Sequence, residues 1–413
     1  MTWPLIVVGA GAAGIMAAIQ AAERGVKVLV LERNPRPGKK ILISGNGRCN
    51  VTNVNAGPDT YTGTNPHFAK SALSQFGVWP TLAFFEELGL EWKEEGEGRV
   101  FPLTNQASSV LELLEYRLER LGVEVQCSAR LESISRDGEL WKVGLHGGES
   151  RLARRVIVTP GSNAYPQLGT TGDGYEVMKR LGHALVPTYP SLVPMLTDRA
   201  EFHRMQGNRL QVDAVAEIDG KPVASRPGEV LFTPTGLSGP VPLWLSGPLA
   251  PRVVAGERLA LRLNLLPGKD AEAAEQLLAA RWARDRERTL AFSFVGLLPR
   301  KLGPEIVAMA GADPEQPVGR VPESVRRELA RLLTSLEVPI SGLAGLEQAE
   351  VSGGGVSTDQ VSSKTMESKL HPGLHLAGEI LDIHGDWGGY NFQFAWSSGW
   401  VAGVSAAAAL GKR

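Results

Sequence analysis

The chain has 413 residues, 43% of them hydrophobic and 21% charged, which is typical of a globular protein with two or three domains. Its 43 basic and 44 acidic residues give a formal net charge of -1, so no global field attracts nucleic acid or an anionic membrane. Two cysteines, Cys49 and Cys127, exclude a disulfide framework and a cysteine-based zinc site, and they suit a reducing compartment.

The uncharged stretch from Pro4 to Ala22 superficially resembles a membrane span or a secretory signal. No basic residue precedes it, whereas a secretory signal begins with a basic region. Gly9, Gly11 and Gly14 also interrupt it at patterned spacing. We therefore expect no export signal, no membrane span and a cytoplasmic protein.

The first 33 residues have the pattern of one βαβ unit. Residues 5–8 are a short apolar run, which predicts a buried parallel strand. An alanine-rich helix is expected over residues 12–24, ended by Gly25, and a second buried strand over 26–31, closed by Glu32.

The loop between that strand and helix is GAGAAG, residues 9–14. In dinucleotide-binding folds the first glycine allows the turn, the second lets the backbone approach a pyrophosphate, and the third lets helix and strand pack closely. The helix N-terminus offers N–H groups to phosphates, and a strand-end acid bonds a ribose hydroxyl. FAD or NAD fits here, whereas a carboxylate disfavours NADP. The residues expected to bind are Gly9, Gly11, Ala12, Ala13, Gly14 and Glu32.

Further elements follow in chain order. We expect helices near 68–89 and 109–121, a strand and a hairpin within 123–146, a buried strand at 156–158, and a helix from Asp173, its N-cap, to Leu181. Alternation then predicts strands at 209–218, 229–233 and 258–263, and helical periodicity appears strongest at 271–291 and 322–336. A final helix is expected over 391–410.

These changes of pattern predict an α/β protein with a discontinuous Rossmann-like domain and two insertions. The nucleotide-binding domain would comprise residues 1–188 and 345–413. A β-rich insertion would occupy residues 189–268, and a small helical insertion would occupy residues 269–344.

Two more glycine-rich segments point to a flavin. Residues 38–50 mix glycine, amide and guanidinium donors, which suits wrapping around a phosphate or a flavin edge. Near the C-terminus, Gly378-Glu379 ends a predicted strand, where an acid suits a ribityl hydroxyl. Gly388-Gly389 then opens a helix whose N-terminus suits the pyrimidine edge of a flavin.

The motifs VVGAGAAG, GKKILISGNGRCNVTN, TGDGY, GLSGP, TMESK and AGEILDIHGDWGGYNFQFAWSSG occur in this order. Over nearly its whole length the chain therefore resembles the BaiN-like (YhiN-type, aminoacetone-oxidase-like) family of bacterial FAD flavoproteins. The resemblance implies a two-dinucleotide-binding-type FAD domain, a β-barrel-like insertion and a helical insertion. It places Lys40, Ser44, Gly45, Arg48 and Asn50 near the pyrophosphate or isoalloxazine, and Gly378, Glu379, Gly389, Tyr390 and Asn391 at the ribityl chain and pyrimidine edge. We also include Arg33, Thr159 and Gly161 in the FAD site.

Because a flavin performs hydride transfer itself, the protein need only bind, orient and tune it. We expect FAD-dependent hydride transfer to a small organic substrate, favouring NAD(P)H-driven reduction of an enone-type C=C bond. NAD(P)H would dock transiently, since a second nucleotide fingerprint is absent from the sequence. His384 and Tyr390 are the catalytic candidates, and the intrinsic pKa of histidine suits proton transfer at neutral pH.

Two alternatives stay open. One is an amine or aminoketone oxidase, which would transfer electrons from the flavin to O2. The other, more distant hypothesis is an RNA-linked flavoprotein. Residues 281–331 include ten basic and seven acidic residues, and their net charge of +3 is small for a surface that binds a phosphate backbone. We expect neither nucleic acid nor a metal ion as a partner, and the sequence makes no prediction of oligomeric state.

Overall fold

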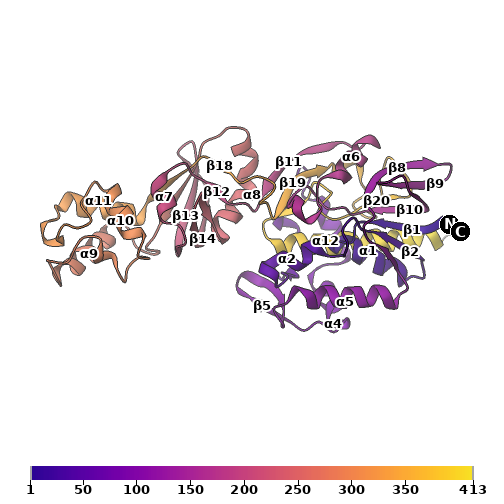
Figure 1. Ribbon diagram of the computed structural model, residues 1–413, viewed down its shortest axis with the longest axis horizontal. Helices are drawn as coiled ribbons and strands as arrows, with labels where there is room; N and C mark the ends of the chain where they lie inside the picture. The colour runs from indigo at the N-terminus through magenta and orange to yellow at the C-terminus, as the bar shows by residue number, and fades with distance from the viewer. Residues whose placement is uncertain (1, 412–413) are drawn as a thin grey trace. The chain divides into compact units, whose positions relative to one another are not determined.

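The computed structural model describes residues 2–411, which fall into two compact units. Unit 1 contains the chain up to Pro190 and again from Ala349 onward, and unit 2 comprises Ser191–Gln348. Unit 1 therefore holds both the indigo beginning and the yellow end of the chain in Figure 1. Among residues 2–411, no helix combines the length and apolar character that a membrane crossing requires.

Unit 1 is built on a seven-stranded sheet with the order β7-β2-β1-β10-β9-β8, in which β20 also pairs with β10. The pairings of β1 with β2 and β10, of β2 with β7, and of β10 with β20 are parallel. The strands are β1 (Thr2–Val8), β2 (Val28–Leu31), β7 (Glu124–Gln126), β8 (Leu131–Asp137), β9 (Leu140–Leu145), β10 (Ser150–Val158) and β20 (Leu374–Leu376). This confirms the α/β class with a Rossmann-like core of parallel strands.

The central strand β1 is apolar because both of its faces are covered. Strand β1 lies between β2 and β10 within the sheet, and the side chains of Leu5, Ile6 and Val7, which point to alternating faces, are all fully buried. Strand β10 has two sets of partners: residues 150–153 pair antiparallel with β9, and residues 156–158 pair in parallel with β20. The β8–β9 hairpin thus extends the sheet at the beginning of β10.

The first and last helices of unit 1, α1 (Ala12–Ala22) and α12 (Gly388–Gly411), pack closely together (Figure 1). A Cβ at Gly399 would lie 2.3 Å from the carbonyl oxygen of Ala13, and one at Gly403 would lie 2.4 Å from that of Ala17. These glycines are four residues apart on one face of α12, as close helix packing requires. The contact places the C-terminal segment beside the N-terminal glycine loop.

Smaller elements complete unit 1. Its other helices are α2 (Lys39–Gly47), α3 (Phe68–Gln75), α4 (Val78–Glu87), α5 (Ala107–Arg120) and α6 (Asp173–Arg180). Three small sheets contain β11 (Leu185–Ser191) with β19 (Val351–Val356), β21 (His384–Gly385) with β4 (Tyr61–Thr62), and β3 (Thr52–Asn53), β6 (Arg99–Pro102) and β5 (Trp92–Glu95).

Two details differ from expectation. The helical pattern over 68–89 is interrupted at Gly77, which is the N-cap of α4 and divides α3 from α4. Gly172, with a left-handed φ of 79°, is the N-cap of α6, so Asp173 is instead its first helical residue. The Asp173 carboxylate accepts hydrogen bonds from Arg33 and Arg130, which explains why it does not cap the helix.

Unit 2 contains a seven-stranded antiparallel sheet in the order β17-β16-β13-β14-β15-β12-β18. Its strands are β12 (Met195–Leu196), β13 (Arg209–Ile218), β14 (Lys221–Thr233), β15 (Gly236–Ser238), β16 (Leu259–Asn264), β17 (Leu336–Ile340) and β18 (Gly342–Leu343). The end strands β17 and β18 are separated only by Ser341, whose N–H donates to Leu196 O. One nearly continuous segment therefore pairs at both ends of the sheet order, which gives the insertion its barrel-like character.

The helices of unit 2 are α7 (Ala200–Arg204), α8 (Pro240–Val254), α9 (Ala271–Ala283), α10 (Leu302–Met309) and α11 (Glu323–Thr334). The expectation of a β-rich insertion over residues 189–268 misses α8, because this helix contains Pro248 and Pro251 and therefore lacks helical propensity. The α9 helix is also shorter than the predicted 271–291. Residues from both predicted insertions, such as Phe232 and Leu329, lie in one hydrophobic core, so the structure joins them in one unit.

Candidate functional site

The three glycines of the GAGAAG loop have different surroundings. A Cβ at Gly9 would lie 2.3 Å from Thr159 O, and one at Gly14 would lie 1.8 Å from Gly9 O, so packing within the protein requires both glycines. A Cβ at Gly11 would meet no atom within 4 Å. The second glycine is therefore left without a packing role, as expected where a ligand approaches the backbone.

The N-terminus of α1 is suited to an anion. Gly11 is its N-cap, no side chain caps the helix, and its first turn, Ala12 to Gly14, contains no acidic residue. The first N–H groups and the positive end of the helix dipole thus face the space above Gly11.

Glu32 lies at the carboxyl end of β2, as predicted, and only 6% of it is exposed. Its Oε2 accepts the Ala10 N–H at 2.8 Å, and its Oε1 accepts the N–H and Nδ2 of Asn34, both at 2.8 Å. The carboxylate thus ties the glycine loop to the end of β2. A carboxylate has about four acceptor positions, so a ribose diol is still accommodated. The open Gly11, the uncapped helix and this acid fit the ADP half of FAD.

Arg33, Thr159 and Gly161 surround this loop in different ways. Thr159 donates its hydroxyl to Val8 O at 2.8 Å and lies 3.1 Å from Gly9 O, which holds the ends of β1 and β10 together. Arg33 donates to Thr171 and to Asp173, so its guanidinium is held by the 171–173 turn. Gly161 has a φ of 78°, a left-handed conformation that favours glycine.

Lys40 and Glu379 are 339 residues apart in the sequence but form an ion pair at 2.6 Å. The pair connects α2 to the turn after β20. Gly378 in that turn has a φ of 77°, and a Cβ there would lie 2.8 Å from Ala13 Cβ on α1. The structure thus brings the predicted ribityl-binding turn next to the predicted pyrophosphate loop.

The segment 44–50 is a kinked loop. Gly45 and Asn46 have φ values of 57° and 58°, which interrupt α2. The Ser44 hydroxyl donates to Ile41 O. Arg48 donates from Nη1 to both oxygens of Glu95 at 3.0 Å and packs over Phe101, so its guanidinium already has a carboxylate partner.

Cys49 in the same segment is fully buried, and burial raises the pKa of its thiol to about 12, so the thiolate is absent at neutral pH. Asn50, with its amide oriented to satisfy its neighbours, donates to Thr52 O at 2.9 Å and accepts the Gly389 N–H at 3.1 Å. Asn50 therefore anchors the N-terminus of α12.

The loop before α12 is held by its own side chains. Asn391 accepts the Gly385 N–H at 2.9 Å and donates to Gly385 O and Trp387 O, both at 2.8 Å. Tyr390 is 8% exposed, and its carbonyl oxygen accepts the Tyr61 hydroxyl at 2.9 Å. The N–H groups of Tyr390 and Asn391 donate to Trp387 O. These residues fix the loop shape, and direct contact with a flavin stays a prediction.

His384 is 2% exposed and stands directly opposite Thr62 in the β21–β4 pair. Its Nε2 lies 2.8 Å from Thr62 Oγ1 and 3.5 Å from the Tyr189 hydroxyl. The Tyr189 ring meets the imidazole edge-on, at 5.6 Å between centroids. Burial lowers the pKa of His384 to about 4, despite the opposing effect of Asp382. His384 is therefore neutral at pH 7, contrary to the expectation that it titrates there.

Asp382 completes this cluster of Thr62, Tyr189 and His384. It is buried, and its carboxylate accepts the N–H and the hydroxyl of Thr64. Tyr189 lies over Gly353, where a Cβ would come 2.2 Å from the ring. Sequence reasoning missed Tyr189 and Thr62 because they lie 195 and 322 residues from His384 in the chain.

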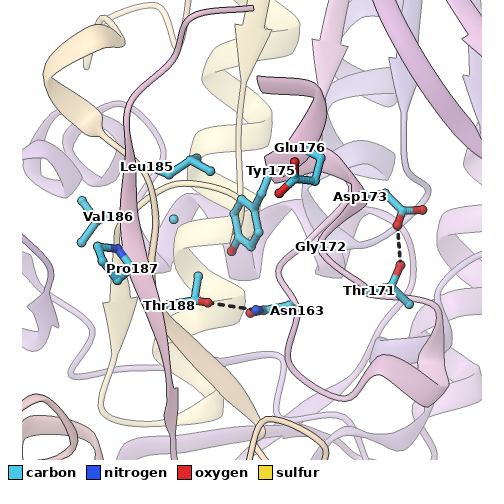
Figure 2. Close-up of a pocket in the computed structure, with 11 residues that line it drawn as sticks. Asn163, Thr171, Gly172, Asp173, Tyr175, Glu176, Leu185, Val186, Pro187 and Thr188 are labelled. Atoms are coloured by element: carbon cyan, nitrogen blue, oxygen red, sulfur yellow. Dashed lines mark hydrogen bonds between the residues drawn. The ribbon is translucent and has the colours of Figure 1, made fainter. Parts of the chain in front are cut away.

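A cavity of about 440 Å³ lies in unit 1, between the 163–176 segment and β11. Figure 2 shows Tyr175 at its centre, with the hydrogen bond from Asn163 to Thr188 on one side. The Tyr175 hydroxyl donates to Glu379 O at 3.4 Å, so the cavity backs onto the Lys40–Glu379 turn. The predicted FAD-binding and catalytic residues are not part of its lining. Within residues 2–411, no cluster of three His, Cys, Asp or Glu side chains suits a metal ion.

Comparisons with known proteins agree with this geometry. The sequence profile described as HI0933-like protein Rossmann domain matches residues 4–405. The chain is 34% identical over 403 residues to the 3-dehydro-bile acid delta(4,6)-reductase of Clostridium scindens, covering 97% of this chain and 98% of the relative. It is 34% identical over 402 residues to the ribosomal RNA dihydrouridine synthase of Escherichia coli, covering 96% of each.

A solved structure shares the fold. The 3-ketosteroid-delta4-(5alpha)-dehydrogenase of Rhodococcus jostii matches with a TM-score of 0.50 and 16% identity, over 98% of each chain. The profile and the two full-length relatives confirm the resemblance seen in the motifs. The chain therefore belongs to the HI0933-like family of Rossmann-fold flavoprotein oxidoreductases.

Proposed function

We propose that this chain binds FAD and reduces a C=C bond conjugated to a carbonyl group in a small organic molecule, with electrons from NADH or NADPH. The main support for this proposal is the 34% identity, over 97% of the chain, to a protein named as a 3-dehydro-bile acid delta(4,6)-reductase. That name describes double-bond reduction in a 3-oxo compound. Such a bond accepts a hydride at its β-carbon because the carbonyl oxygen takes up the charge.

The residues of unit 1 support this cofactor. The open space above Gly11 and the uncapped N-terminus of α1 would hold the pyrophosphate, and Glu32 would hold the adenosine ribose. The turn at Gly378-Glu379, tied to Lys40, would take the ribityl chain. FAD would supply a two-electron hydride carrier between NAD(P)H and the substrate.

NAD(P)H would dock transiently, because the sequence contains only one GxGxxG loop within a βαβ unit. The α-carbon of the substrate takes its proton from solvent or a nearby side chain. One hydride and one proton thus saturate the double bond, and NAD(P)H is oxidised.

RNA is the second candidate substrate, since one relative is named as a ribosomal RNA dihydrouridine synthase. The chemistry is shared, because the C5=C6 bond of uracil is also conjugated to a carbonyl. The charges favour a small substrate: residues 191–348 hold nineteen basic and nineteen acidic residues. Arginines there are paired with carboxylates, as in Arg204–Glu305, Arg326–Glu275 and Arg331–Glu328.

The first experiment mixes the yellow holoprotein anaerobically with NADH and then NADPH, and follows the flavin absorption band. Rapid bleaching by one of them, then reoxidation by 2-cyclohexen-1-one or a 4-en-3-one steroid, is the expected result. Reoxidation by a uridine-containing ribosomal RNA fragment alone, with steep salt dependence, would replace the small substrate with RNA. No bleaching by either nucleotide contradicts the proposal, and oxygen consumption with amines would then test the oxidase alternative.

A further inference from the structure

Glu350 is a carboxyl group that the proposed reaction does not yet use. It directly precedes β19, and its side chain is exposed. Its Oε2 lies 4.0 Å from the position that a Cβ would take at Gly388, the first residue of α12. The pyrimidine edge of the flavin is expected at this helix N-terminus, so Glu350 lies beside the predicted position of the reacting ring.

Two other carboxylates near this loop are occupied. Glu379 accepts Lys40 Nζ at 2.6 Å. Asp382 accepts the N–H of Thr64 at 2.8 Å. By contrast, within the part of the chain that the structure describes, Glu350 has no hydrogen bond and no ion pair. Both of its oxygens are therefore free to exchange a proton with solvent or with a ligand.

The surroundings of Glu350 favour its protonated form. Although the side chain is exposed, nearby protein displaces part of its hydration, and this desolvation raises the pKa of the carboxyl above its ordinary value of 4.5. Lys40 is the charged group that opposes this effect, and it is already paired with Glu379.

Other proton carriers near the loop are less suitable. Burial lowers the pKa of His384 to about 4, so its imidazole carries no extra proton to give at pH 7. Burial raises the pKa of Tyr189 to about 12, so its hydroxyl holds its proton tightly. Glu350 instead combines a proton that it can release with exposure to solvent, from which it recovers that proton.

We propose that Glu350 is the proton donor of the reduction and delivers its carboxyl proton to the α-carbon of the substrate. The inference rests on the proposed function, which it deepens by naming the side chain that completes the addition of hydrogen. The substrate gains a hydride at its β-carbon, and the electron pair of the C=C bond moves to the α-carbon. There it forms a C–H bond while the O–H bond of Glu350 breaks. The remaining carboxylate takes a proton from solvent, and NAD(P)H is the net reductant.

Glu350→Gln nearly keeps the shape of the side chain but removes its acidic proton. The rate at which 2-cyclohexen-1-one reoxidises the reduced holoprotein is divided by the rate with ferricyanide, which takes single electrons and needs no proton on carbon. General damage to the holoprotein cancels in this ratio. We expect the ratio to fall about 100-fold or more in Glu350→Gln, as for loss of a general acid.

Two further variants make the test specific. Glu350→Asp retains a carboxyl group and should lose less than Glu350→Gln. Glu112→Gln removes another exposed carboxyl of unit 1, on α5, and should keep the wild-type ratio. A Glu350→Gln ratio equal to that of the wild type, or a smaller loss in Glu350→Gln than in Glu350→Asp, overturns the proposal.

The pH dependence supplies a second readout. In the wild type the ratio should fall as the pH rises through the pKa of Glu350, because only the protonated carboxyl delivers a proton. This dependence should be absent from Glu350→Gln. The same pH dependence in both proteins would assign the proton to another group.

A titration without turnover tests Glu350 directly. The oxidised holoprotein, labelled with 13C at its glutamate carboxyl groups, is titrated by NMR, and the signal missing from Glu350→Gln is assigned to Glu350. We expect a midpoint above 4.5, and a change of this midpoint when 2-cyclohexen-1-one is added. A midpoint at or below 4.5, or one that the enone leaves unchanged, overturns the role of Glu350.

The two proposals fail in different ways. If the enone reoxidises the flavin equally well in Glu350→Gln and in the wild type, the function stands and the inference falls. If no conjugated carbonyl reoxidises the flavin of the wild type, both fall.

Discussion

The two units hold their polar side chains in different ways. In unit 1, buried or partly buried carboxylates and amides bond to backbone groups: Glu32 to Ala10 N–H, Asp382 to Thr64 N–H, and Asn391 to Gly385. In unit 2, charged side chains mostly bond to each other on exposed helices and strands, as Arg331 does to Glu328. Buried side-chain-to-backbone bonds fix geometry, whereas exposed ion pairs contribute about 0–1 kcal/mol. Unit 1 should therefore be sensitive to changes of a single atom, and unit 2 should tolerate them.

The largest expected effect comes from two glycines of one loop. Gly14→Ala should lower the free energy of unfolding by about 3 kcal/mol, because the added Cβ would overlap the Gly9 carbonyl. Gly11→Ala should change the stability of the apoprotein by less than about 0.5 kcal/mol, since its Cβ enters open space. Urea unfolding of both apoproteins measures this difference.

The same pair tests the cofactor site. Gly11→Ala should weaken FAD binding by about tenfold or more, because the methyl group takes the space above the helix N-terminus. Titration of FAD into the apoprotein, followed by flavin fluorescence, measures the affinity. If Gly11→Ala bound FAD with wild-type affinity, the pyrophosphate would not lie at this position.

The second effect is a loss of stability in mild acid. His183, His375 and His384 are buried, and burial lowers the pKa of each from 6.5 to about 4. The unfolded chain binds protons below about pH 6.5, whereas the folded chain stays neutral down to about pH 4. Stability is thus fully present above pH 6.5 and falls as the pH drops towards 4, by up to about 3 kcal/mol per imidazole.

Urea midpoints at pH 7, 6 and 5 measure this dependence. His375→Leu is the matched variant, because His375 is fully buried and neither of its ring nitrogens has a partner. It should flatten the pH dependence without loss of folding at pH 7. A midpoint that stays constant from pH 7 to 5 in the wild type would mean that these histidines titrate normally.

The third effect compares one carboxylate from each unit. Glu32→Gln replaces an acceptor of three hydrogen bonds by a group with one acceptor atom, which should destabilise the apoprotein by about 1–3 kcal/mol and weaken FAD binding. Glu217→Gln in unit 2, which loses only its pairing with Arg262, is the control. Equal losses of stability in the two variants would refute the contrast between the units.

The smallest effect belongs to the helices of unit 2. Arg331→Ala removes an ion pair with Glu328 whose members are 51% and 39% exposed. The free energy of unfolding should fall by at most about 0.5 kcal/mol, and FAD binding should not change. A loss above about 1.5 kcal/mol would show that this surface network is structural.

Local patterns predicted the nucleotide-binding unit because its signals lie close together in the chain. The strand, the GAGAAG loop, the helix and Glu32 fall within 32 residues, and close backbone contacts require glycine at positions 9 and 14. The strand at 156–158 also followed from a short apolar run, and its parallel partner at 374–376 corresponds to the strand expected before Gly378-Glu379. Helix α8 escaped prediction because its prolines argue against a helix, which tertiary packing of Val241 and Leu245 overrides.

The site was predictable only in part for the same reason. His384 could be picked from its glycine-rich loop, but its neutral state depends on burial, which the sequence does not display. Thr62 and Tyr189 reach it through pairing and packing between distant segments. Arg48 is the type of side chain that binds phosphate, yet in the fold its Nη1 lies 3.0 Å from the Glu95 carboxylate.

The segment from Leu336 to Leu343 has a consequence for association between molecules. It pairs with β16 through β17 and with β12 through β18, so the sheet order begins and ends on the same eight residues. An open sheet of this size would expose two long rows of unpaired N–H and C=O groups, on which a strand of another molecule could add. Here the end strands are five and two residues long. Unit 2 therefore offers little template for intermolecular strand addition, which should protect it from aggregation through its sheet.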